Sequence, residues 1–149
     1  MTEPRITKEA LETLAREQLP LAEQMGIEID EIRLGEVTVR ARYREAFLRP
    51  GGTIAGPVMM MLADFAMYGV VLSLIGPVAM AVTTQLNINF LRRPAPGDVV
   101  AEGRILKLGK RLAVGEVSLH SESGGALVAH CTATYSIPPD HLSVAEFPE

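Results

Sequence analysis

The chain has 149 residues, of which 48% are hydrophobic and 21% charged, a composition typical of one globular domain with a sizeable core. A net charge of −4 argues against nucleic acid as a partner, and a single cysteine excludes an internal disulfide. The N-terminal stretch MTEPRITKEALETLAREQ is too polar for a signal peptide, so we expect a cytoplasmic protein.

The N-terminal residues 7–18 predict an amphipathic helix. Thr7 is a suitable N-cap for it, and Pro20 ends it. Four apolar residues share one face at helical spacing: Ala10, Leu11, Leu14 and Ala15. Residues 1–24 therefore form an N-terminal helical segment ahead of the main domain.

The remainder of the chain, apart from one apolar segment, predicts β-structure. Residues 27–43 alternate between apolar and polar side chains around Gly35, which predicts a hairpin, and residues 44–55 predict a loop rich in Arg, Pro and Gly. Four further runs predict strands: 79–91, 99–108, 112–121 and 126–137. Because short turns join them, the strands should be antiparallel. Residues 139–149 form a C-terminal tail.

The segment GPVMMMLADFAMYGVVLSLIG, residues 56–76, predicts a long helix that is apolar on nearly all sides. Gly56-Pro57 suits its start and Gly76-Pro77 its end. Its length would allow a membrane span, but the charge of Asp64 and the lack of basic and aromatic anchors favour a helix buried in protein. One sheet cannot cover such a helix completely, so we expect a homo-oligomer.

Asp64 is the only charged residue of this helix. A buried carboxylate costs several kcal/mol unless other groups compensate its charge. Two interpretations follow. Asp64 is either a structural group tied to Arg49 or to backbone donors, or a group that carries out chemistry.

Three features together resemble a known family: a glycine at the start of an apolar helix, a lone aspartate two turns later, and the strand-and-turn sequence LNINFLRRPAPGD. Over residues 25–138 the chain resembles the hotdog-fold acyl-CoA thioesterases of the phenylacetate-degradation (PaaI-like) type. The resemblance implies an α+β fold in which a curved antiparallel sheet wraps the long central helix. It also implies a homodimer, or a dimer of dimers, with two sheets joined edge to edge and active sites at the interface.

The same resemblance implies roles for individual residues. Asp64 would be the general base or nucleophile, and Gly56 of the partner subunit would donate to the oxyanion. Thr83 would lie near the hydrolytic water, with Thr84 as the neighbouring alternative. The histidine that the family usually carries before the glycine is Ala55 here, and the asparagine of some members is Arg49.

Candidate substrate-binding residues form two groups. The first surrounds the catalytic candidates and includes methionines suited to an adaptable acyl pocket: Arg49, Met60, Met61, Tyr68, Thr84 and Phe90. The second comes from the basic middle of the chain and could contact the phosphates of coenzyme A: Arg92, Arg93, Lys110 and Arg111. We expect no metal site and no cofactor, since coenzyme A enters as part of the substrate.

The sequence thus predicts hydrolysis of an acyl-CoA thioester to a free acid and coenzyme A, with neither nucleic acid nor membrane as a partner. The alternative is a non-catalytic acyl-CoA-binding hotdog protein, which Ala55 and Arg49 favour. A hydratase on the same fold would place a histidine with the acid, and no histidine lies near this helix in the sequence. A structural or interaction domain would have no use for Asp64.

Overall fold

The computed structural model of the protein describes residues 3–122 and 125–139. Of the predicted C-terminal tail, residues 140–149 lie outside the described residues. The elements in chain order are α1 (Lys8–Gln18), α2 (Pro20–Gln24), β1 (Ile27–Arg33), β2 (Glu36–Ala41), the 3₁₀ helix η1 (Glu45–Phe47), β3 (Leu48–Arg49), β4 (Thr53–Ile54), α3 (Gly56–Ile75), β5 (Val82–Phe90), β6 (Val99–Leu108), β7 (Leu112–Ser121) and β8 (Leu127–Ser136).

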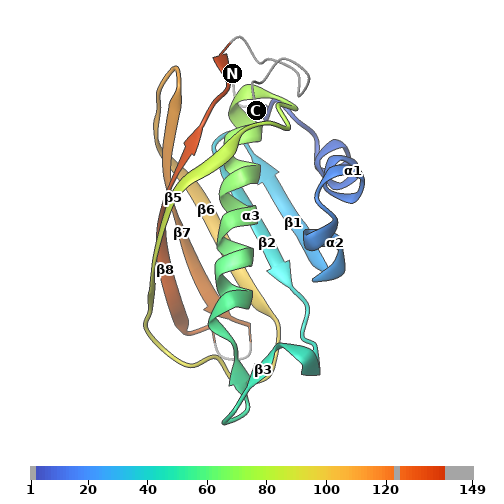
Figure 1. Ribbon diagram of the computed structural model, residues 1–149, viewed down its shortest axis with the longest axis vertical. Helices are drawn as coiled ribbons and strands as arrows, with labels where there is room; N and C mark the ends of the chain where they lie inside the picture. The colour runs from blue at the N-terminus through green and yellow to red at the C-terminus, as the bar shows by residue number, and fades with distance from the viewer. Residues whose placement is uncertain (1–2, 123–124, 140–149) are drawn as a thin grey trace.

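Six of the strands form one antiparallel sheet, in the order β1-β2-β6-β7-β8-β5. The long helix α3 lies across the inner face of this sheet, and α1 and α2 lie beside its β1 edge (Figure 1). This confirms the predicted architecture of one apolar helix against one antiparallel sheet. The strand β5 forms the opposite edge, so one side of β5 has no neighbouring strand among residues 3–122 and 125–139.

Two glycines of the sheet allow α3 to approach it closely. A Cβ atom on Gly115 in β7 would lie 2.5 Å from the Sδ of Met67, and one on Gly103 in β6 would lie 3.0 Å from Val70. A Cβ atom at either position would force the side chain of Met67 or Val70 to shift. Met67 therefore packs into the core under the middle of the helix, where it is fully buried.

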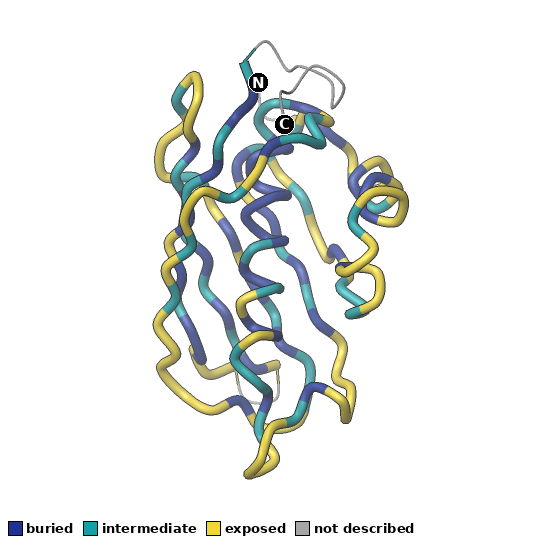
Figure 2. Tube along the Cα trace, in the orientation of Figure 1, coloured by how far each residue is buried: buried dark blue, intermediate teal, exposed yellow. Residues whose placement is uncertain are grey.

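Most of α3 is buried, as Figure 2 shows, and its first turns are more exposed. The helix is long and apolar enough to cross a membrane, with a mean hydropathy of 2.0 in its best window, yet 72% of that window is buried inside the protein. The sheet and the N-terminal segment supply this cover, which supports the prediction of a buried core helix. Pro57 and Met60 remain exposed on one side of its N-terminal half.

The predicted elements of the N-terminal half are largely confirmed. Thr7 caps α1 by accepting a hydrogen bond from the Ala10 N–H over 3.1 Å. Leu11 and two other predicted residues of the apolar face are buried, but Ala10 is exposed. The predicted loop 44–55 is wrong in part, because it contains η1 and a hairpin of the two-residue strands β3 and β4.

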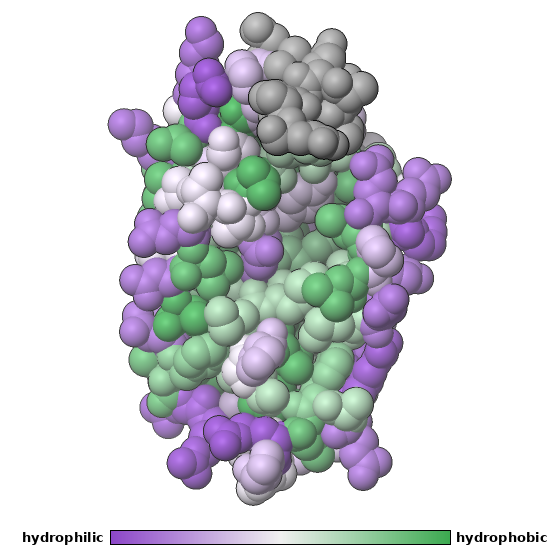
Figure 3. Space-filling model, in the orientation of Figure 1, coloured by the Kyte–Doolittle hydropathy of each residue, from purple (hydrophilic) through white to green (hydrophobic). Residues whose placement is uncertain are grey.

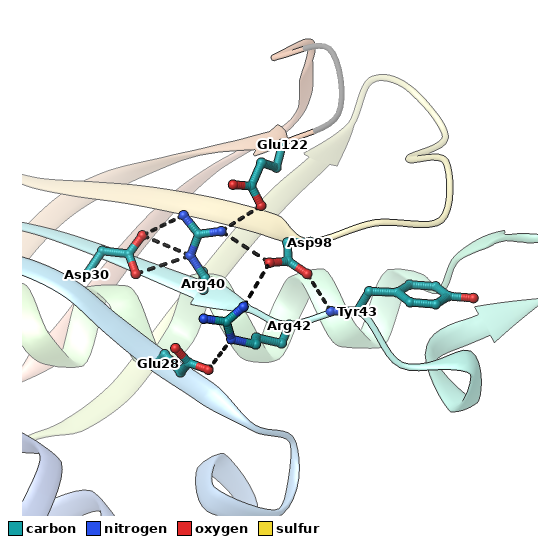
Figure 4. Close-up of polar contacts among 7 residues, drawn as sticks. All are labelled: Glu28, Asp30, Arg40, Arg42, Tyr43, Asp98 and Glu122. Carbon is teal, nitrogen blue, oxygen red and sulfur yellow. Dashed lines mark hydrogen bonds and ion pairs between the residues drawn. The ribbon is translucent and has the colours of Figure 1, made fainter.

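A network of charged side chains joins β1 and β2 to the turns that flank β6 and β7 (Figure 4). The Arg40 guanidinium donates to the carboxylates of Asp30, Asp98 and Glu122, at 2.9, 3.2 and 2.6 Å. Asp98 also accepts the Tyr43 N–H at 2.7 Å. The network ties four segments that are distant in sequence.

Candidate active site

Asp64 lies in the middle of α3, half-buried, on the side of the helix that faces β5 and β8. Its carboxylate accepts two side-chain hydrogen bonds. The Thr83 hydroxyl donates to Oδ1 over 2.6 Å, and the Tyr135 hydroxyl donates to the same oxygen over 2.8 Å. Two hydroxyl groups from two neighbouring strands thus hold the only charge of the helix.

A β-bulge in β5 brings the Thr83 hydroxyl to this position. Thr83 pairs with Tyr135, whereas the next pair of the ladder is Gln85 with Thr134, so Thr84 is the extra residue. An extra residue reverses the alternation of side chains along a strand. As a result Thr83 faces the helix together with Leu86, and the Thr84 hydroxyl bonds instead to the Thr134 carbonyl on the exposed side. Thr83, not Thr84, is the threonine of the site.

A cavity of about 450 Å³ opens beside Asp64. One wall comes from α3 and includes Met61, Phe65 and Tyr68, and the opposite walls come from residues 18–22 and 79–83. Apart from Asp64, Thr83, Gln18 and the two tyrosines, the lining side chains are apolar. The volume and the few convergent polar groups are typical of a small-ligand site.

Burial keeps the hydroxyl and thiol groups around Asp64 protonated. Burial, together with the nearby Asp64 charge, raises the pKa of Tyr135 well above its ordinary value. Burial also raises the pKa of Tyr68 to about 12 and that of the Cys131 thiol to about 11. All three are therefore neutral near pH 7, and Tyr135 can donate to a carboxylate but cannot serve as a base.

The proposed oxyanion donor Gly56 lies at the start of α3, eight residues before Asp64, which is about 12 Å along the helix axis. One chain therefore does not bring the two together. The ring of Phe90 lies against Gly56, where a Cβ atom would come within 3.3 Å of it. Phe90 and Met60 are 48% and 42% exposed, so both lie at the open start of the helix and outside the cavity.

The structure contradicts the pairing of Asp64 with Arg49. Arg49 is exposed on β3, in the hairpin that precedes the start of α3, and no ion pair joins the two side chains. The partners of Asp64 are hydroxyl groups from β5 and β8, whereas the structural interpretation predicted Arg49 or backbone donors. Arg49 also does not line the cavity.

The four basic candidates for phosphate contact are all exposed but do not form one surface. Arg92 and Arg93 follow the end of β5, whereas Lys110 and Arg111 lie in the turn between β6 and β7. The register places that turn near Val82 at the start of β5, because Leu112 and Val82 both pair with Ser136. The two pairs are thus separated by the length of β5, about 25 Å.

Sequence analysis missed Tyr135 and the wall that residues 18–22 contribute. A signal for Tyr135 was available, since it continues the apolar series Ala129, Cys131 and Ala133, and a tyrosine on a buried face needs a partner for its hydroxyl. The strand register that places it opposite Thr83 could not be read from the sequence.

His130 lies on the outer face, where it contacts Glu116, away from the buried Cys131.

Within residues 3–122 and 125–139, no cluster of three His, Cys, Asp or Glu side chains is arranged to hold a metal ion. The polar side chains that line the cavity are instead one carboxylate, hydroxyl groups and the Gln18 amide, and the carboxylate has the hydroxyl groups as its donors. Such a set can activate water or attack a carbonyl carbon.

Comparison with known proteins identifies the family. A model of the thioesterase superfamily matches residues 51–128. A protein of Saccharolobus solfataricus that is provisionally named an esterase is 30% identical over 113 residues, 76% of this chain and 74% of that protein. The 1,4-dihydroxy-2-naphthoyl-CoA hydrolase of Listeria monocytogenes is 28% identical over 113 residues, 75% of this chain and 92% of that enzyme.

Solved structures agree. The crystal structure of a protein from Silicibacter sp., provisionally described as a thioesterase, is 43% identical, with a TM-score of 0.83, and the match covers 92% of this chain and 95% of that one. A mutant of the phenylacetic acid degradation protein PaaI from Thermus thermophilus is 30% identical, with a TM-score of 0.70 over 78% of this chain and 97% of that one. The chain therefore belongs to the thioesterase superfamily, and its helix and sheet form the hotdog fold.

Proposed function

We propose that the protein hydrolyses an acyl-CoA thioester to a free acid and coenzyme A, with Asp64 as the general base or nucleophile. The observation that carries this proposal is the position of Asp64, the only charged residue of α3, at the wall of a largely apolar cavity. A carboxylate there can activate a water molecule or attack the thioester carbonyl directly. The naphthoyl-CoA hydrolase relative supports coenzyme A as the carrier of the acyl group.

The acyl group would occupy the cavity, and its carbonyl would need an oxyanion donor. The start of α3 can supply one, because the Gly56 N–H begins the helix and the helix dipole favours negative charge there. Pro57 has no N–H, so Gly56 is the first donor of the helix. Since Gly56 lies about 12 Å from Asp64 in one chain, the donor would come from Gly56 of the partner subunit.

The free edge of β5 supports such a dimer. Two β5 strands that pair antiparallel about a two-fold axis would place the start of one strand beside the end of the other. Thr83 would then lie near the start of α3 in the second copy. The same pairing would bring Lys110 and Arg111 of one copy to the end of the sheet where Arg92 and Arg93 of the other lie, in reach of one coenzyme A. Hydrolysis by this route uses no metal and no further cofactor, and a cytoplasmic location is part of the proposal.

The test compares the wild type with Asp64→Asn, which keeps the size of the side chain. Release of free coenzyme A is followed from acetyl, hexanoyl, decanoyl, palmitoyl, benzoyl and phenylacetyl esters. We expect turnover of at least one ester and a loss of kcat of about 100-fold or more in the variant. Glu9→Gln, on the exposed first turn of α1, is the control and should match the wild type.

Two other outcomes would contradict the proposal. Binding of the esters by both proteins without turnover would support an acyl-CoA-binding protein, consistent with Ala55 and Arg49 at the positions of the family's histidine and asparagine. Equal turnover by the wild type and Asp64→Asn would show a thioesterase that does not use this carboxylate.

A further inference from the structure

Tyr135 is placed to act on Asp64 in a way that packing alone does not require. It pairs with Thr83 across β8 and β5, so both side chains leave the sheet at the same level and on the same face. Its hydroxyl lies 2.8 Å from Oδ1 of Asp64 and 3.0 Å from the Asp64 carbonyl oxygen. One hydroxyl thus contacts both the main chain and the side chain of the same residue, which restricts the rotamer of Asp64.

The hydrogen bonds divide the two oxygens of the carboxylate. Both donors, Thr83 and Tyr135, reach Oδ1, and within the described residues no side chain donates to Oδ2. In the same part of the chain, no buried side-chain oxygen or nitrogen lacks a partner. An unpartnered Oδ2 must therefore be accessible, and Asp64 lines the cavity.

We propose that Tyr135 is a positioning residue, which together with Thr83 fixes Oδ1 of Asp64 and thereby presents Oδ2 to the reacting thioester or water. This inference rests on the proposed function and adds which oxygen reacts and what holds it. Burial keeps the Tyr135 hydroxyl protonated near neutral pH, so the donor is present throughout the working range. A carboxylate held at one oxygen loses the freedom to rotate away from the attacking geometry.

A purely structural role makes a different prediction. The Tyr135 ring packs against Tyr68, with centroids 6.2 Å apart, and phenylalanine would keep that contact. Tyr135→Phe would then change stability but not the turnover of the folded protein. If the hydroxyl positions Asp64, the ground-state binding of the acyl group changes little, whereas the chemical step slows.

The experiment measures kcat and KM of Tyr135→Phe with the best ester of the panel, after circular dichroism confirms folding. We expect kcat to fall about 10- to 100-fold, as for the loss of a hydrogen bond to a charged group, with KM within about twofold. Tyr68→Phe removes another hydroxyl of the same cavity. This hydroxyl donates to the Ala79 carbonyl and not to Asp64, so its loss should affect binding of the acyl group, and therefore KM, more than kcat. The third tyrosine gives the control outside the cavity, Tyr43→Phe, which should match the wild type.

The outcomes separate this inference from the proposed function. A wild type that hydrolyses no ester overturns both. An active wild type with an unchanged kcat in Tyr135→Phe overturns the positioning role alone. If Tyr135→Phe does not fold, site-specific 4-aminophenylalanine at position 135 keeps the ring and a hydrogen-bond donor, but a weaker one, so Oδ1 of Asp64 is held less firmly. It should lower kcat with little change in KM, and an unchanged kcat would again overturn the role.

Discussion

Thr83 and Thr84 are identical neighbours, yet only one of their hydroxyls reaches Asp64. The bulge at Thr84 decides between them, since it turns Thr83 inward beside Leu86. The resemblance gave Thr83 as the candidate near the hydrolytic water and Thr84 as the neighbouring alternative, and the bulge settles which hydroxyl reaches Asp64. A bulge has no reliable signal in a single sequence, so residue types alone left both threonines open.

At the residue scale, the neighbouring threonines provide a matched test. Thr83→Val keeps the shape of the side chain and removes a donor to Asp64, so we expect kcat to fall about tenfold. Thr84→Val removes a hydroxyl that bonds only the Thr134 carbonyl on the exposed side, and its kcat should stay within about twofold of the wild type. Steady-state kinetics on both variants is the measurement. Equal losses of kcat in the two variants would show that the integrity of β5, and not the Thr83 hydroxyl, determines the rate.

At the element scale, the sequence predicts α3 and the long strands well. The Gly-Pro pairs at both ends of α3 mark its limits, and alternation marks β1, β2 and β6 to β8 to within one or two residues. Predictions fail where elements are short or depend on distant contacts. The hairpin of β3 and β4 has two residues a strand, too few for a periodic pattern. The charge network of Arg40 depends on four segments that only the folded chain brings together.

Asp98 is the residue of this network with the clearest pH signature (Figure 4). The hydrogen bond from the Tyr43 N–H, and after it the Arg40 guanidinium, hold the pKa of Asp98 below its ordinary value of 3.8. A carboxyl group whose pKa is lowered by folding stabilises the folded state at pH values above its ordinary pKa. This stabilisation is lost as the pH falls through the pKa of the folded state. Asp98→Asn should therefore lower the free energy of unfolding at pH 7 by about 1–2 kcal/mol.

The measurement is urea unfolding of the wild type and Asp98→Asn at several pH values. The difference should be constant near neutral pH and shrink as the pH falls below about 4, because the wild-type carboxylate becomes protonated. Glu31→Gln is the control, since the Glu31–Arg33 pair is exposed, with 53% and 64% of the side chains accessible, and should contribute under about 0.5 kcal/mol. A difference that does not depend on pH would exclude the ionised form of Asp98 as the cause.

At the scale of the whole molecule, one face remains apolar. In Figure 3 the surface over α3 is mainly apolar, and hydrophilic side chains gather at its margins. Three large apolar residues near the unpaired edge of the sheet are between 42% and 58% exposed: Met60 of α3, and Val82 and Phe90 at the two ends of β5. Large exposed apolar patches of this kind mark contact sites. The excess of apolar residues in α3 predicted this face from the sequence, but the strand order that places it beside β5 did not follow from the sequence.

The dimer through this face can be tested at Phe90. We expect the wild type to sediment as a dimer or a dimer of dimers. Phe90→Glu should shift it toward monomer, because each copy then brings one unpaired charge into an apolar interface. Leu106→Glu is the matched control. Leu106 is 51% exposed on β6, close to the 48% of Phe90, but lies away from the β5 edge.

The same two variants connect assembly to chemistry. If the oxyanion donor comes from Gly56 of the partner subunit, kcat of Phe90→Glu should rise with protein concentration as dimers re-form, whereas Leu106→Glu should show a kcat independent of concentration. Sedimentation velocity and initial rates over the same concentration range are the measurements. A wild type that is monomeric and fully active would show that one chain supplies the whole site. In that case the oxyanion donor must come from groups near Asp64 in the same chain, because Gly56 lies about 12 Å from it along α3.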